Sequence, residues 1–91
     1  MKPTPWYVYV VECSDSSLYC GITLDILRRV KEHNESPKGA KYTRSRRPVA
    51  LLIQWEVPTR SEAMKKEYRF KKLPRSGKLK IINKYKGIKD D

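Results

Sequence analysis

A run of aromatic and β-branched residues near the N-terminus, WYVYVVEC at 6–13, constrains the fold more than any other stretch. Such residues favour a β-strand, and both of its alternating faces are apolar, which is typical of an inner strand covered on each side. The two predicted faces are Trp6, Val8 and Val10 on one side and Tyr7, Tyr9 and Val11 on the other. Four polar turn residues at 14–17 and a second strand at 18–22 follow, so the sequence predicts a hairpin.

A helix is predicted directly after the hairpin. Thr23 is the expected N-cap, Asp25 suits the helix dipole in the first turn, and the helix runs to about Asn34. Its expected buried stripe consists of Ile26, Leu27 and Val30. At about 100° per residue, His33 projects close to Ile26 and Arg29 lies further round, at the edge of the stripe, so both polar side chains border the core.

The second half of the chain predicts a loop, a strand and two further helices. The loop covers 35–47, the strand 49–57, and a capping box of Thr59 and Glu62 opens a helix that runs to Leu73. The expected apolar stripe of that helix is Ala63, Met64 and Phe70, with Leu73 at its edge. A basic helix at about 75–86 and a frayed tail at 87–91 complete the chain.

These elements predict an α/β protein of the α+β type. The order β-β-α-β-α-α favours a small three-stranded, mainly antiparallel sheet flanked by helices. With 91 residues, we expect one domain over 1–91, whose core covers about 6–73. A core of this size leaves no room for a spacious cavity, so function is expected in a surface groove.

The charge balance favours a polyanionic partner. There are 21 Lys and Arg residues against 10 Asp and Glu, which gives a net charge of +11. Such an excess is typical of proteins that bind nucleic acid, although a solvated basic surface with no partner is the alternative. The expected partner is DNA, with RNA left open, and neither a membrane nor a small-molecule cofactor is expected.

The expected location is the cytoplasm, because the sequence shows no apolar run long enough for a membrane span and no signal-peptide core. Cys13 and Cys20 lie on successive predicted strands and could be cross-strand neighbours. In a reducing compartment they are expected to be buried thiols. Two cysteines and one histidine are too few ligands for a structural zinc site.

Glu67 is the most unusual acidic residue, because it falls within the apolar stripe of its helix. A carboxylate there is costly unless it is paired or binds a metal. One interpretation is a ligand for Mg²⁺, which often takes one or two protein carboxylates and completes its shell with water and phosphate. The other is an ion pair with Arg28, Arg29 or a neighbouring lysine.

Two further pairs of residues could carry chemistry. Arg29 and His33 are one helical turn apart, so Arg29 could clamp a phosphate and His33 could move a proton near neutral pH. Tyr9 and Tyr19 lie on adjacent strands, but whether they share a face depends on a hairpin register that the sequence leaves open. The alternative for all four is structural: a surface arginine, a hydrogen-bonded histidine and two strand aromatics.

Basic residues in two segments predict a nucleic-acid surface. A solvated run of charge is the alternative, and it is disfavoured if the two segments meet in space. Tyr42 could stack on an unpaired base. The predicted contact residues are Lys38, Lys41, Tyr42, Thr43, Arg44, Arg46 and Arg47 in the loop, and Lys66 and Arg69 on the second helix.

Taken together, these residues resemble the GIY-YIG nuclease superfamily, and in particular its small single-domain UPF0213 members. The two half-motifs are Tyr7-Val8-Tyr9 and Tyr19-Cys20-Gly21. The helix DILRRVKEHN at 25–34 and the run GAKYTR at 39–44, followed by Arg47-Pro48, match in the expected order. The resemblance covers about 6–73.

The resemblance implies a metal-dependent endonuclease that acts on DNA, with branched or damaged DNA as candidate substrates. It implies that Tyr9 and Tyr19 are the motif tyrosines, one of which activates water, and that Arg29 contacts the phosphate. It further implies that His33 assists and that Glu67 binds one Mg²⁺ or Mn²⁺ ion. The alternative is a nucleic-acid-binding module with little or no catalytic activity.

The chain departs from the family pattern at several points. Tyr7 stands where many members have glycine, and Ile22 stands where the excision-repair nucleases carry a lysine. Many members also have an asparagine after the glutamate, for which Asn83 is the only later candidate. Many relatives carry an additional DNA-recognition domain, so targeting by a separate protein is a further expectation.

Overall fold

The computed structural model describes residues 4–87 and confirms the predicted order of elements, with one short extra helix inside the predicted loop. Most of the predicted tail at 87–91 lies outside the described residues. The elements are β1 (Trp6–Glu12), β2 (Leu18–Thr23), α1 (Ile26–Glu35), α2 (Lys41–Arg44), β3 (Ala50–Val57), α3 (Arg60–Lys72) and α4 (Arg75–Gly87).

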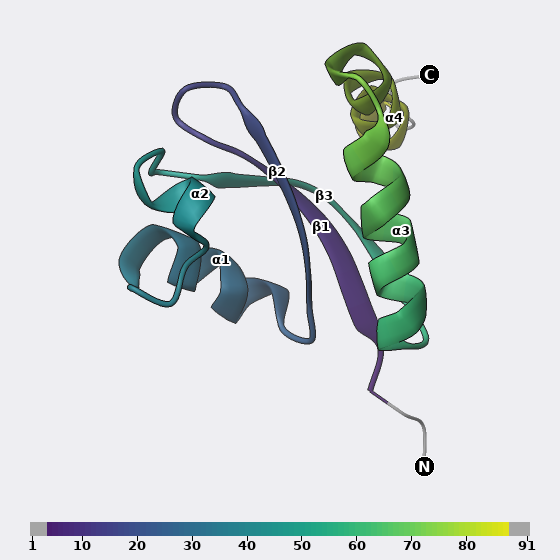
Figure 1. Cartoon of the computed structure of the whole chain (residues 1–91), viewed down its shortest axis with the longest axis horizontal. Helices are drawn as coiled ribbons and strands as arrows, with labels where there is room; N and C mark the ends of the chain where they lie inside the picture. The colour runs from purple at the N-terminus through teal and green to yellow at the C-terminus, as the bar shows by residue number, and fades with distance from the viewer. Residues whose placement is uncertain (1–3, 88–91) are drawn as a thin grey trace.

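The three strands form an antiparallel sheet in the order β2-β1-β3, so the apolar first strand lies in the centre as predicted (Figure 1). The hairpin register pairs Tyr9 with Gly21 and Val11 with Tyr19. Because residues two apart on a strand share a face, Tyr9 and Tyr19 lie on the same face as diagonal neighbours. The register therefore brings the two motif tyrosines together.

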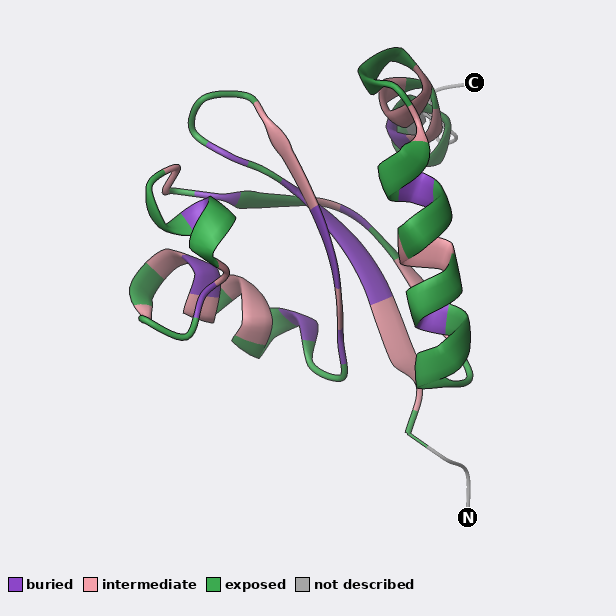
Figure 2. Cartoon of the chain, viewed as in Figure 1, coloured by how far each residue is buried: buried purple, intermediate pink, exposed green. Residues whose placement is uncertain are grey.

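The helices cover the two faces of the sheet separately, with α3 and α4 on one side and α1 and α2 on the other (Figure 1). Buried residues follow the central strand on both faces and the sheet-facing side of α3 (Figure 2). Cys13 and Cys20 are both buried, as predicted, but they belong to the clusters on opposite faces. The expectation that they could be cross-strand neighbours is therefore wrong.

Three local predictions are wrong for physical reasons. Asp25, and not Thr23, is the N-cap of α1, because its side chain accepts a hydrogen bond from Arg28 N at 3.1 Å. Thr23 ends β2 and is buried, and its hydroxyl accepts a hydrogen bond from Asp25 N. Leu27 and Met64 are 84% and 45% exposed, because α1 and α3 each contact the sheet along a narrower stripe than predicted.

The predicted start of α3 is confirmed. Thr59 is its N-cap and accepts a hydrogen bond from Glu62 N at 3.1 Å, while Ala63 and Phe70 are its buried residues. Between residues 4 and 87, no helix combines the length and apolar character needed to cross a membrane.

Candidate active site

A hydrogen-bonded chain of buried side chains connects the sheet to α1 and α2. The Tyr9 hydroxyl lies 2.7 Å from Nε2 of His33, and Nδ1 of His33 lies 2.9 Å from Oγ1 of Thr43. These three side chains are at most 1% exposed. The Thr43 hydroxyl also lies 2.9 Å from Ala40 O, and the backbone N–H of Ala40 donates to Nδ1 of His33 at 3.4 Å. The two ring nitrogens of His33 thus have their partners within the protein: Tyr9 at Nε2, and Thr43 and Ala40 N at Nδ1.

Gly21 allows this chain to form. A Cβ atom at position 21 would lie 2.6 Å from the Tyr9 hydroxyl oxygen and 2.8 Å from its ring carbon Cζ. Any larger residue would have to displace the tyrosine ring from His33. The glycine of the second half-motif is thus required by the tyrosine of the first, across the β1–β2 ladder.

Burial keeps both members of the Tyr9–His33 pair neutral near pH 7. Burial, together with the nearby charge of Arg29, lowers the pKa of His33 from 6.5 to about 4. Burial likewise raises the pKa of Tyr9, and the neighbouring Arg29 opposes this shift only in part. Tyr9 therefore remains a neutral phenol that is hydrogen-bonded to a neutral imidazole.

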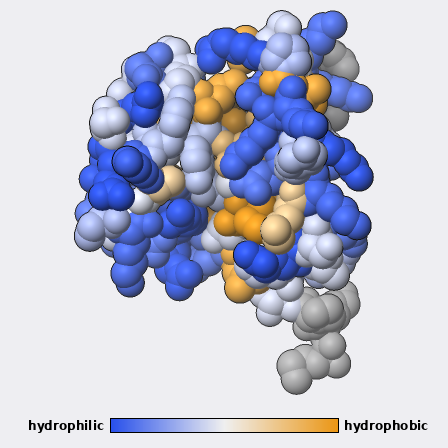
Figure 3. Space-filling model, in the orientation of Figure 1, coloured by the Kyte–Doolittle hydropathy of each residue, from blue (hydrophilic) through white to orange (hydrophobic). Residues whose placement is uncertain are grey.

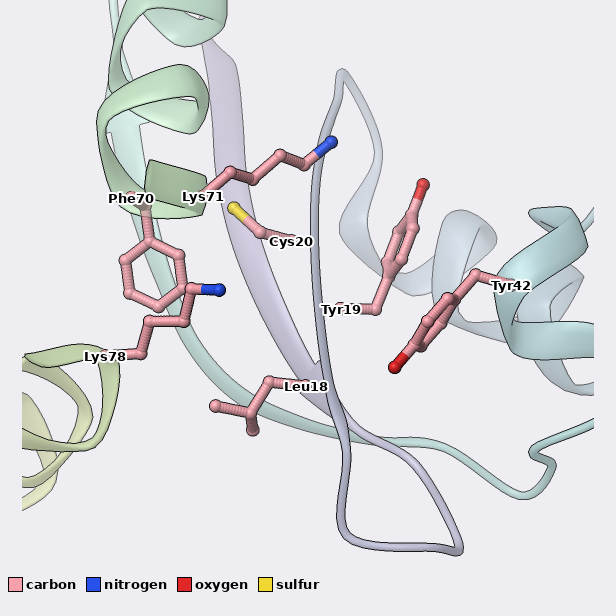
Figure 4. A pocket seen from close by; sticks show the side chains of 7 residues that line it. All are labelled: Leu18, Tyr19, Cys20, Tyr42, Phe70, Lys71 and Lys78. Atoms are coloured by element: carbon pink, nitrogen blue, oxygen red, sulfur yellow. The ribbon is translucent and has the colours of Figure 1, made fainter. Parts of the chain in front are cut away.

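Tyr19 is the motif tyrosine that reaches the surface, since it is half-buried whereas Tyr9 is fully buried. Its ring centroid lies 6.4 Å from that of Tyr9 and 5.3 Å from that of His33, with the His33 contact edge-on. On its outer side it stacks against Tyr42 of α2 at 6.0 Å (Figure 4). Tyr19 thus connects the buried chain to the solvent.

Arg29 is positioned by α1 beside these aromatic side chains. Its Nη1 donates to Oε1 of Glu32 and to the backbone oxygen of Lys38, both at 2.9 Å, which fixes the guanidinium. Its side chain is 26% exposed, so the positive charge lies at the border between the core and solvent. Arg29 thus borders the core as predicted, whereas His33 is completely buried within it.

Glu67 approaches the tyrosines from the other side of the sheet edge. It forms an ion pair with Lys71 of 3.1 Å between Oε2 and Nζ, and Nζ lies 5.9 Å from the centroid of the Tyr19 ring. The charges of Glu67 and Lys71 both act on the Cys20 thiol, whose pKa burial raises to about 12. Glu67 therefore lies on the β2 side of α3, where the predicted ion pair with a neighbouring lysine is present.

The donor set fits a single-carboxylate Mg²⁺ or Mn²⁺ site. Among residues 4–87, no cluster of three or more His, Cys, Asp or Glu side chains could enclose a metal ion. Glu67 is a lone carboxylate, which suits a hard cation that keeps several waters and takes further oxygens from a phosphate. Its partner Lys71 has a 51% exposed side chain and is therefore free to withdraw into solvent.

Two of the predicted nucleic-acid contacts have internal roles instead. Thr43 is completely buried in the hydrogen-bonded chain, so it cannot reach a nucleic acid. Arg47 donates to the backbone oxygens of His33 and Ser36 and so caps the C-terminal end of α1. Both corrections arise because the predicted loop folds back onto α1 as α2.

The other predicted contacts fall on two separate surfaces. The side chains around α2 that remain at the surface are Lys38, Lys41, Tyr42, Arg44 and Arg46. Of these, Arg46 pairs with Asp15 at 3.1 Å and lies 4.0 Å from the Tyr42 ring centroid. Lys66 lies over Trp55 of β3, at the far edge of the sheet from β2, and shares a surface hollow with Arg69. Lys66 and Arg69 therefore do not converge with the loop residues.

Two lysines that the sequence interpretation did not select lie closer to the tyrosines. Lys71 of α3 and Lys78 of α4 line the same hollow as Tyr19 and Tyr42 (Figure 4). Glu67 and Lys71 are four residues apart on a helix, and this spacing was a sequence signal for Lys71. No sequence signal identified Lys78, because the packing of α4 places it there.

A family model described as the GIY-YIG catalytic domain matches residues 5–86. This chain belongs to the GIY-YIG family. It is 52% identical over 77 residues to a UPF0213 protein of Desulfotalea psychrophila, covering 85% of this chain and 70% of that protein. A UPF0213 protein of Bacillus velezensis is 47% identical over 99% of this chain and 90% of its own length.

Solved structures of similar proteins agree with the fold. The solution structure of a UPF0213 protein from Bacillus halodurans is 47% identical and has a TM-score of 0.57, covering 87% of this chain and 83% of its own. A second solution structure, from E. faecalis, is 41% identical with a TM-score of 0.62, covering 93% and 91%. The GIY-YIG assignment supports a nuclease-like function for this chain.

Proposed function

We propose that this GIY-YIG domain is a divalent-metal-dependent endonuclease that hydrolyses phosphodiester bonds in DNA. The observation that carries the proposal is the convergence of Tyr9, Tyr19, Arg29 and His33 beside β2, with Glu67 joined to Tyr19 through Lys71. A Mg²⁺ or Mn²⁺ ion held by Glu67 would supply positive charge for the phosphate oxygens and polarise water.

Tyr19 and Arg29 carry the direct chemistry in this proposal. The Tyr19 hydroxyl is the motif hydroxyl that solvent reaches, so it orients the attacking water and takes part in removing its proton. Arg29 donates N–H groups to the phosphate, where it offsets the negative charge that develops as water attacks phosphorus. The Glu32 and Lys38 contacts hold the guanidinium in place for this role.

Tyr9 and His33 act as positioning residues. Both are buried and neutral and are hydrogen-bonded to each other, so neither is placed to contact water directly. Their chain to Thr43 fixes the face of the hairpin against which Tyr19 packs. Catalysis that depends on geometry to a fraction of an ångström requires such rigid support.

The test is Mg²⁺- or Mn²⁺-dependent nicking of plasmid, flap and branched DNA. Glu67→Gln, which keeps the shape of the side chain, is expected to lower the rate at least a hundredfold, as losses of charge-stabilising groups do. Glu56→Gln on the exposed part of β3 removes the same charge far from β2 and is the matched control. Equal rates for the wild type and Glu67→Gln would contradict the proposal.

The Glu67–Lys71 ion pair favours one alternative function. A carboxylate that is already neutralised by lysine binds a cation less readily, which would leave a nucleic-acid-binding module with little or no activity. This alternative predicts DNA binding that weakens steeply with salt, no turnover with any divalent ion, and no Mn²⁺-induced broadening of NMR signals near Glu67. Broadening that is lost in Glu67→Gln would contradict it.

A further inference from the structure

A hollow of about 360 Å³ opens between β2 and the two C-terminal helices. Its walls come from four elements: β2 supplies Tyr19, α2 supplies Tyr42, α3 supplies Lys71, and α4 supplies Lys78 (Figure 4). Because Tyr19 and Lys71 also belong to the candidate active site, the hollow is continuous with that site. Its volume lies within the range of small-ligand sites, about 300–1,000 Å³.

The lining combines a flat aromatic wall, an apolar floor and two cations. Tyr19 and Tyr42 stack with an interplanar angle of 26° on one side of β2, while Leu18 and Phe70 provide apolar surface on the other side of this edge strand. Hydrophobic surface is also visible along the seam between the sheet and α3/α4, within a largely hydrophilic face (Figure 3). No carboxylate lines the hollow in the described part of the chain.

This chemistry suits a planar, partly apolar ring attached to an anion. A base that stacks on Tyr42 would take the place of the Arg46 guanidinium, which lies 4.0 Å from the ring centroid, and base–aromatic stacking tolerates any base. Lys71 from α3 and Lys78 from α4 present positive charge at the same opening, where they would meet a phosphate.

We propose that this hollow binds one unpaired nucleotide of a nucleic acid strand next to the phosphate that is cleaved. The inference rests on the proposed nuclease function, because it names the substrate class of the same site. A base stacked and paired in a duplex presents only its edges, so it cannot fill a recess with a flat aromatic wall. The preferred substrate is therefore a strand with unpaired bases beside the cleavage point, and intact duplex is a poor one.

The experiment measures binding without cleavage. The full chain, in EDTA, is titrated into a short oligonucleotide that carries the fluorescent base 2-aminopurine, offered as single-stranded DNA, single-stranded RNA, a flap and an intact duplex. We expect the fluorescence to change for the unpaired substrates, with weaker binding and no such change for the duplex. The DNA and RNA arms identify the sugar that is preferred.

Two pairs of variants locate the binding to the hollow. Tyr42→Ala is expected to weaken binding of the single strand about tenfold and leave duplex binding unchanged, as the loss of a stacking partner does. Tyr68→Ala removes an exposed tyrosine of α3 outside the hollow and is the control. Lys78→Glu is expected to weaken single-strand binding more than Lys80→Glu, which makes the same charge change on an exposed position of α4.

Equal affinity of the wild type for single strand and duplex would overturn the inference. So would a Tyr42→Ala variant that loses the same factor of affinity for single strand and for duplex. Circular dichroism of each variant shows whether a loss reflects unfolding, and Lys78→Glu against Lys80→Glu provides a test that does not depend on Tyr42. If unpaired strands bind as expected but Mg²⁺ and Mn²⁺ produce no cleavage, the binding site stands and the proposed nuclease function fails. The two conclusions are therefore distinguishable.

Discussion

The two faces of the sheet are stabilised by different chemistry. The α3/α4 face is closed by apolar side chains, with Val8, Val10 and Phe70 at most 5% exposed. The α1/α2 face buries apolar residues as well, but its centre is the polar chain of Tyr9, His33 and Thr43. Apolar contacts are non-directional, whereas a buried hydrogen-bonded chain permits one arrangement.

The candidate active site lies where the two faces meet, at the β2 edge. The polar face orients Tyr19 and Arg29, while the apolar face holds α3 so that Glu67 and Lys71 reach the same edge. This division predicts that changes on the apolar face affect mainly stability. Changes in the polar chain are expected to affect three properties together: catalysis, stability, and the dependence of stability on pH.

The largest effect on stability is expected for Phe70→Ala. Phe70 is 5% exposed and packs against Trp55 with ring centroids 5.8 Å apart, so truncation leaves a cavity and should lower the free energy of unfolding by about 3–5 kcal/mol. Urea unfolding measures it. Tyr68→Ala, on the exposed side of the same helix, is the control and should change stability by less than about 0.5 kcal/mol. A comparable loss in both variants would mean that α3 does not pack as described.

The next largest effect is a dependence of stability on pH that arises from His33, on the α1/α2 face alone. His33 has a pKa of about 4 when folded and 6.5 when unfolded, so the unfolded chain binds more protons between these values. The free energy of unfolding should therefore have its highest value above pH 6.5. It should decrease by up to about 3 kcal/mol as the pH drops to 4.

Urea unfolding of the wild type and His33→Gln at several pH values measures this contribution. Asp15 and Glu32 have pKa values lowered by hydrogen bonds, to Ser17 and to Arg29 respectively, and they titrate in both proteins. The difference between the two curves isolates His33. Parallel curves between pH 4 and 6.5 would show that His33 is not buried in its neutral form.

A smaller effect is expected for Gly21→Ala, which places a Cβ atom against the Tyr9 ring and hydroxyl. Overpacking of this kind typically costs about 1–3 kcal/mol. Because the nearest atom is the Tyr9 oxygen, the cost should decrease in a Tyr9→Phe background. A double-mutant cycle by urea unfolding measures the coupling, and additive effects would mean that the two motif residues do not meet across the ladder.

The smallest effect is expected for Lys71→Ala, which releases Glu67 from a partly exposed ion pair. Pairs of this kind contribute about 0.2–1 kcal/mol, so Mn²⁺ affinity should rise by no more than a few-fold. Isothermal titration in the absence of nucleic acid measures it, with Lys72→Ala, a neighbouring exposed lysine, as the control. A loss of Mn²⁺ affinity would show that Lys71 supports the metal site.

Much of the fold could be predicted because strand and helix signals are local. The central strand, the turn at 14–17 and the Thr59 cap follow from alternation and turn or cap chemistry, and the structure confirms them. Leu27 and Met64 were misplaced because helical periodicity identifies an apolar side but not the width of the contact. The helix α2 was missed because a single turn has no periodicity to read.

For the site, the sequence by itself determined which side chains are available: two tyrosines, an arginine, one histidine, and a glutamate on an apolar stripe. Their arrangement depended on the tertiary structure. The register decided that Tyr9 and Tyr19 share a face. The fold of the loop onto α1 decided that Thr43 and Arg47 turn inward, and the packing of α4 brought Lys78 to the hollow. The reason is physical, since residue type and spacing are local properties, whereas register and helix packing depend on contacts between segments far apart in the chain.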